Sequence, residues 1–309
     1  MSHPFASRTL TKKTAAYFNV HVAVVLFGGA GLFGKWIDLS SGAIVLGRAF
    51  LGAFFIFLFS QILDWYALKK EAAPNSRTIS FKQFQPKSTK DLLVFGLLGA
   101  ILAFHWVAFF EAIQRSTVAI GVLTFSTFPI FTTLLEPFFS KEKLQFSDVL
   151  LACIAFLGVL LVLPTLSFQH HYTQGALWGL AAGASFAILT LLSQRMIEGY
   201  SSNCVSFYQN GIAALFLLPF FAADLLAGTK RDWIYLLLLG LIFTAIAHTL
   251  FIHSMKIIPA KTASLIASLE PLYAIVFACF FLGEIPTRSM YLGGLMTLGV
   301  AFYAMSKNR

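Results

Sequence analysis

The chain has 309 residues, of which 58% are hydrophobic and 11% charged, and its formal net charge is +9. About a quarter of the residues of a soluble globular protein are charged, so this composition excludes that class. The apolar runs are continuous rather than alternating, which excludes an outer-membrane barrel. The basic residues are scattered through short segments between these runs, a pattern that argues against nucleic acid as a partner. The composition therefore predicts a polytopic helical membrane protein.

A membrane-spanning helix needs about 20 predominantly apolar residues. By that measure we expect ten spans, near residues 16–36, 42–63, 91–112, 116–139, 147–165, 174–195, 203–226, 232–253, 260–282 and 288–306. The longest connection, residues 64–90, is rich in Lys and predicts a solvated loop. The first run is long and is followed by nine more, so we interpret it as a helix rather than a signal peptide.

The Lys and Arg residues predict the orientation of the spans. With the N-terminus inside, the segments on the opposite side hold only five of the 22 basic residues, and Arg48 lies within a span. Because cytoplasmic segments carry the excess of Lys and Arg, we expect both termini in the cytoplasm. The expected location is the cytoplasmic (inner) membrane.

The sequence contains a weak internal repeat. Residues 126–131 align with residues 268–273 at a shift of 142, and the same shift carries Glu142 onto Glu284. We therefore expect two five-helix halves, 1–165 (including the loop) and 174–309. Five spans is an odd number, so the halves must be inverted relative to one another, as in many secondary transporters. The predicted fold is all-α, with ten transmembrane helices in two inverted five-helix repeats around a central cavity.

These features, with a proline-containing fourth helix that ends in Glu in each half, resemble the EamA-type transporters of the drug/metabolite transporter superfamily. The strings Leu269-Glu270-Pro271 and Leu282-Gly283-Glu284 are similar to that family's C-terminal motif, and Phe27 to Lys35 with Arg48 resembles its first half. The resemblance implies a central cavity that moves small metabolites, commonly amino acids, by alternating access. Members often export, and some scavenge. Glu136-Pro137 in the first half departs from the pattern.

Glu270 is the strongest candidate site residue. It lies about nine residues into its span, roughly 14 Å deep at 1.5 Å per residue. A carboxylate at that depth is costly unless it is paired, protonated or facing water. It either binds a substrate amine or a proton, or it is a structural acid bonded to a neighbouring helix. Its counterpart in the repeat is Phe128, so the fold alone does not require the acid.

Arg48 and two histidines are the next candidates. Arg48 lies within the second span and needs an anionic partner, for which Glu111 and Asp38 are candidates; the alternative is direct contact with substrate. His105 and His248 occupy corresponding positions in the two halves. They form either a proton relay with Glu270 or neutral side chains hydrogen-bonded across helix interfaces.

Aromatic, amide and proline residues complete the candidate set. Trp106, Trp178, Tyr208 and Tyr273 either line an apolar pocket or face lipid, and Phe128 is a further candidate for the substrate site. Gln209 either joins helices or contacts substrate. Pro129 and Pro271 are expected to bend the fourth helix of each half. The remaining acids are expected to be structural: Glu136 by snorkelling or capping a helix end, and Glu142 and Glu284 by bracing helix ends.

The leading hypothesis is a secondary transporter for amino acids or related amphipathic metabolites, with export favoured over import. Alternatives are an uptake transporter for a cofactor or nucleotide-like metabolite and, in another class, a membrane-embedded enzyme or a non-transporting membrane subunit. We expect no catalytic residues, because the sequence has no motif such as His-Glu-x-x-His. We expect no cofactor and no metal, since the three cysteines have no paired spacing. The expected partners are a small-molecule substrate and the lipid bilayer, with a homodimer as a further expectation.

Overall fold

The computed structural model describes residues 4–70, 84–139, 144–164 and 167–307. All long elements in this part of the chain are helices. In the first half they are α1 (Pro4–Ala30), α2 (Phe33–Trp36), α3 (Ser41–Lys70), α4 (Thr89–Arg115), α5 (Val118–Phe125), α6 (Phe128–Phe139) and α7 (Phe146–Val162). In the second half they are α8 (His171–Gly199), α9 (Ser202–Leu226), α10 (Lys230–Gly240), the π-helix η2 (Leu241–Ile246), α11 (Ala247–Ser254), α12 (Ala260–Ala267), α13 (Glu270–Leu282) and α14 (Arg288–Lys307).

These helices confirm the predicted all-helical membrane fold. Eight helical stretches are long and apolar enough to cross a bilayer, and α7 is a further, shorter apolar helix. With α14, they account for the ten predicted spans. Four of the spans consist of consecutive helical pieces: α1–α2, α5–α6, α10–η2–α11 and α12–α13.

The segment between the second and third spans differs from its prediction. Helix α3 continues to Lys70, so the predicted loop 64–90 begins later, and its residues 71–83 lie outside the described part. Residues 85 and 87–90 at the end of the loop are exposed, as predicted, but Phe84 before them is packed into the bundle. Phe84 is buried against the rings of Phe57 and Phe207, and its carbonyl accepts a hydrogen bond from the Tyr208 hydroxyl at 2.7 Å. Aromatic burial therefore anchors the chain where it enters α4.

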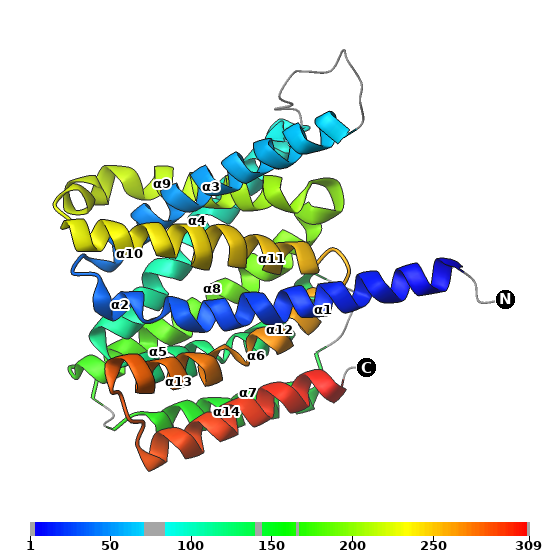
Figure 1. The fold of residues 1–309 in the computed structure, drawn as a ribbon. Helices are drawn as coiled ribbons and strands as arrows, with labels where there is room; N and C mark the ends of the chain where they lie inside the picture. Colours follow the sequence, from blue (N-terminus) through cyan, green and yellow to red (C-terminus); the bar gives the residue numbers. More distant parts are fainter. Residues whose placement is uncertain (1–3, 71–83, 140–143, 165–166, 308–309) are drawn as a thin grey trace.

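The helices form a bundle in which elements of the two halves alternate (Figure 1). Helix α3 packs against α9, α4 against α8, and α7 against α14, so each of these pairs joins the two halves. The contacts also define two groups of helices. In one group α1 packs against α11, α12 and α13, and in the other α8 packs against α4, α5 and α6. The beginning of α1 and the end of α14 lie at one end of the bundle, and α2 lies at the other.

The fourth span of each half is interrupted near its middle. Ser126 and Thr127 separate α5 from α6, and their hydroxyls donate to carbonyls three residues earlier. Ser268 and Leu269 separate α12 from α13 in the same way. Pro129 and Pro271 are each the second residue of the following helix, where a missing N–H costs no hydrogen bond. The interruption therefore lies just before each proline, and the prolines begin new helices rather than bend continuous ones.

Candidate functional site

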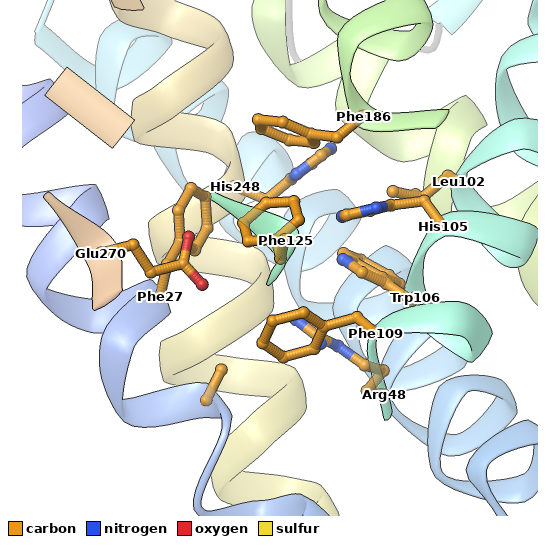
Figure 2. A pocket seen from close by; sticks show the side chains of 11 residues that line it. Phe27, Arg48, Leu102, His105, Trp106, Phe109, Phe125, Phe186, His248 and Glu270 are labelled. Carbon is orange, nitrogen blue, oxygen red and sulfur yellow. The ribbon is translucent and has the colours of Figure 1, made fainter. Parts of the chain in front are cut away.

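A small cavity lies between the two groups of helices (Figure 2). On one side it is lined by Phe27 and Ala30 of α1, His248 of α11 and Glu270 of α13. On the other side it is lined by Leu102, His105, Trp106 and Phe109 of α4, Phe125 of α5 and Phe186 of α8. Arg48 of α3 completes the lining. The two groups contribute opposite walls, so any relative movement of the groups changes the cavity.

The cavity volume is about 30 Å³. That is enough for a water molecule and too little for an organic metabolite.

Glu270 is buried and is the first residue of α13, directly after the interruption of its span. Figure 2 shows its carboxylate pointing into the cavity. The helix start favours a negative charge, because the first N–H groups and the helix dipole point toward it. Helix α1 approaches closely here: a Cβ on Gly28 would lie 2.7 Å from Cβ of Tyr273 and 3.3 Å from the Glu270 carbonyl oxygen. Glycine at this position lets α1 pack against the start of α13.

Arg48 is buried and is held on the opposite part of the cavity by the π-helix. Its Nε donates to Oγ1 of Thr244 at 3.1 Å, and a terminal nitrogen donates to the Phe243 carbonyl at 3.4 Å. The guanidinium carbon lies 3.9 Å from the centre of the Trp106 ring, a cation–π contact. Because a π-turn breaks the regular helical hydrogen bonding, it offers backbone and side-chain acceptors to a neighbouring cation.

The expected partners of Arg48 are wrong. Glu111 pairs with Arg115 and accepts a hydrogen bond from Ser41, and Asp38 pairs with Arg231. The carboxylate that lines the same cavity as Arg48 is that of Glu270. Within the described residues, however, Arg48 and Glu270 form no ion pair or direct hydrogen bond. The cavity thus holds a basic and an acidic side chain that make no direct contact with each other.

The structure brings both histidines to the cavity and anchors each one separately. Nδ1 of His105 lies 3.0 Å from the Ala182 carbonyl, so this nitrogen carries the proton. Nε2 of His248 lies 2.8 Å from Oε1 of Gln209, whose amide nitrogen donates to Ser193. Gln209 therefore orients His248 from behind rather than lining the cavity. The relay between the histidines and Glu270 stays a prediction.

Several predicted pocket residues lie elsewhere. Trp178 packs beside Phe104, whose side chain is half-exposed on the outside of the bundle. Tyr208 stacks on Phe95, with ring centroids 4.5 Å apart. Tyr273 packs against α1, and Phe128 stacks behind Phe125. Of the predicted aromatic residues, only Trp106 is among the residues that line the cavity.

The cavity includes four phenylalanines that sequence reasoning missed: Phe27, Phe109, Phe125 and Phe186. With 34 Phe in the chain, composition gives no way to choose among them. One signal was available: Phe109 is four residues from His105, so the two share a face of α4.

Two of the predicted structural acids are described, and neither lines the cavity. Glu284 accepts a hydrogen bond from the Val118 N–H, which links α13 to α5. Glu136 lies half-buried on α6. Glu142 lies outside the described residues.

Comparisons with known proteins agree with this architecture. The model of the EamA-like transporter family matches residues 14–163 and again 173–305. The uncharacterized transporter YxxF of Bacillus subtilis (strain 168) is 28% identical over 289 residues, covering 92% of this chain and 88% of the relative. The uncharacterized transporter YwfM of the same organism is 32% identical over 217 residues, covering 67% of this chain and 71% of the relative.

One solved crystal structure has the same fold. The alignment has a TM-score of 0.64 and covers 94% of this chain and 98% of the chain in that structure. At 14% sequence identity, this likeness shows the fold alone.

Proposed function

Because the chain belongs to the EamA-like transporter family, we propose that it is a secondary transporter that moves amino acids or related amphipathic metabolites by alternating access. The observation that carries this proposal is that Arg48 and Glu270, a basic and an acidic side chain, are both buried in one cavity with aromatic walls and do not contact each other. Relatives are named uncharacterized transporters, which supports transport and leaves the substrate to be argued from the site.

A zwitterion fits these two charges. Arg48 presents a planar cation that suits a carboxylate, and Glu270 presents a carboxylate that suits an ammonium group. Phe27, Phe109 and Phe125 offer apolar surface to a side chain. Binding both ends of a zwitterion would offset the cost of burying these two ionisable side chains without an ion pair between them. A nucleotide-like anion is a poorer fit, because Glu270 would repel its phosphates.

The arrangement of the helices supports alternating access. The walls of the cavity belong to two helix groups, and the span that carries Glu270 is interrupted directly before it. The same holds for the span that carries Phe125 and Phe128. Each group can therefore tilt about an interruption near the cavity, as discontinuous helices do in other transporters.

Orientation and direction are part of the proposal. The excess of basic residues on the side of both termini supports a cytoplasmic location for the termini. Export rather than import is proposed from the family resemblance. No motif for ATP binding was found in the sequence, so the driving force would be an ion gradient or the substrate gradient.

Counterflow in proteoliposomes tests this function. Vesicles containing the purified protein are loaded with one amino acid of a panel, and uptake of a radiolabelled trace is followed. We expect accelerated exchange of at least one zwitterionic, apolar amino acid, with loss of exchange in Glu270→Gln and retention in Glu198→Gln, an exposed acid at the end of α8. Exchange of nucleotides but of no zwitterion would overturn the substrate class. Absence of exchange of any metabolite by folded protein would overturn the transporter proposal.

A further inference from the structure

A second hollow lies on the flank of the bundle, away from the central cavity. It is a groove of about 310 Å³ between α13 and α14, with Leu123 of α5 at its base. Val276, Cys279 and Phe280 form one wall, and Met290 and Leu295 form the other. Its volume is about ten times that of the central cavity. It shares no lining residue with that cavity.

The chemistry of the groove is almost wholly apolar. The polar side-chain groups among the lining residues are the hydroxyl of Tyr291 and the thiol of Cys279. Val276 and Leu295 are half-exposed or more, and Phe280 is 83% exposed. In a membrane-spanning helix pair, such side chains face lipid rather than water. The groove is therefore open to the hydrocarbon of the bilayer.

Its length matches one leaflet. The lining on α13 begins at Leu272, just after the interruption of the span, and continues to Pro286 beyond the helix end. From Leu272 to the last helical residue, Leu282, the rise is about 15 Å, which is half of a hydrocarbon core of about 30 Å. A groove of this kind follows the direction of a lipid chain from mid-membrane to the headgroup level.

Its volume also matches one chain. The groove has room for roughly ten groups the size of a water molecule, at about 30 Å³ each, and a methylene is of similar size. At the headgroup end, Arg288 is the first residue of α14 and is exposed, two residues before Met290 of the groove. A cation at a helix start, where the N–H groups also attract anions, suits a phosphate.

We propose that this groove binds one acyl chain of a phospholipid from the leaflet at the C-terminal end of α13, with the phosphate near Arg288. The chain fills the space between α13, α14 and α5 along about ten methylenes. Since α13 begins with Glu270 at the central cavity, the bound chain braces the helix that carries this carboxylate.

Photolabelling tests the site. The protein is reconstituted in vesicles of phosphatidylethanolamine and phosphatidylglycerol that contain a phosphatidylglycerol with a diazirine on one acyl chain, and adducts are mapped by peptide mass spectrometry. We expect severalfold more adducts on residues 272–298 than on the exposed apolar face of α9 around Leu215 and Phe216. Equal labelling of both faces would mean annular contact only and would overturn the proposal.

Two matched variants separate the groove from the surrounding surface. Val276→Trp places an indole in the groove and should lower its labelling to the level of α9. Leu292→Trp changes a 64% exposed side chain of α14 that does not line the groove, and should leave the labelling unchanged. Phe280→Trp serves as a second groove variant if Val276→Trp does not fold. Loss of labelling in the Leu292 variant alone would contradict the site.

Two further outcomes decide the occupant. A diazirine-labelled diacylglycerol that labels the groove as strongly as phosphatidylglycerol would overturn the role of Arg288. Absence of adducts in the groove, together with cross-links between copies through Cys279, would show that a second copy covers it instead.

Discussion

The carboxylate of Glu284 accepts a hydrogen bond from the backbone N–H of Val118 at 2.9 Å, and so joins the end of α13 to the start of α5. The ammonium group of Lys35, at the end of α2, donates to the Ser116 carbonyl in the same turn at 2.7 Å. Gly283 makes this possible, because its φ of 67° reverses the chain at the end of α13. Both contacts join the end of the α1–α13 group to the connection between α4 and α5, at the end of the bundle where α2 lies. We infer that they hold the two groups of helices together at this end.

Glu284→Ala is therefore expected to favour opening at this end. A hydrogen bond to a charged group contributes about 1.5–3 kcal/mol, which corresponds to roughly a tenfold to hundredfold shift between closed and open states. The measurement is the labelling rate of Phe109→Cys by a membrane-impermeant thiol reagent, in a background where the three native cysteines are replaced. Glu284→Gln keeps an acceptor oxygen and should label more slowly than Glu284→Ala. Equal rates in the parent, Gln and Ala proteins would contradict a closing role.

Glu270→Gln is expected to abolish exchange of zwitterions while the protein still folds. The amide keeps the size of the side chain but removes the charge that would hold the substrate ammonium group. Removing one partner of a buried charge pair costs about 2–5 kcal/mol, so the apparent affinity should fall by at least tenfold. Binding is measured by the ligand-dependent shift of the thermal midpoint.

The control for this prediction is a ligand without the ammonium group. An N-acetylated amino acid should bind the parent protein weakly and should lose little further affinity in Glu270→Gln. If the affinity of both ligands falls by the same factor in Glu270→Gln, Glu270 acts on the structure of the site rather than on the ammonium group.

Sequence alone reached the architecture because the bilayer imposes a strong length and composition signal on every span. It also singled out Glu270, Arg48, His105, His248 and Trp106 as candidate site residues, because polar groups inside apolar helices are rare, and the structure places these five around one cavity. Sequence did not distinguish these cavity residues from Trp178 and Tyr208, which do not line the cavity. In a membrane protein the lipid-facing and cavity-facing sides of a helix are both apolar, so periodicity does not distinguish them.

Two other features depend on contacts that sequence spacing does not encode. The π-helix η2 is defined by backbone hydrogen bonds between residues five apart, and the Thr244 hydroxyl also donates to the carbonyl of Leu239, five residues earlier. That shift brings Thr244 and Phe243 to Arg48, from a helix almost 200 residues away. The sequence does not encode this contact, so it predicts acids near Arg48 in the topology, Glu111 and Asp38, as the partners.

Arg48→Lys is expected to weaken substrate binding although the charge is kept. Lysine lacks the planar group that stacks on Trp106 and that can bind a carboxylate through two nitrogens. We expect at least a tenfold rise in the apparent dissociation constant for the amino acid found by counterflow. Arg115→Lys, which changes an exposed arginine paired with Glu111, is the matched control and should have little effect. Parental affinity in the Arg48→Lys protein would exclude bidentate recognition of a carboxylate by Arg48.

Gly28→Ala is expected to separate α1 from α13 and lower the thermal stability. A Cβ at this position would lie 2.7 Å from Cβ of Tyr273 and 3.0 Å from the backbone nitrogen of Ala274, so relief requires movement of a helix rather than of a flexible side chain. Gly96→Ala is the matched control: it also replaces a helical glycine, but a Cβ at Gly96 would meet no neighbouring atom within 4 Å. Alanine there should be neutral or stabilising, by up to about 1 kcal/mol from helix propensity. The thermal midpoint of both variants is measured in detergent by intrinsic fluorescence. A Gly28→Ala protein as stable as Gly96→Ala would mean that the close approach of α1 to the start of α13 is not needed to hold Glu270 at the cavity.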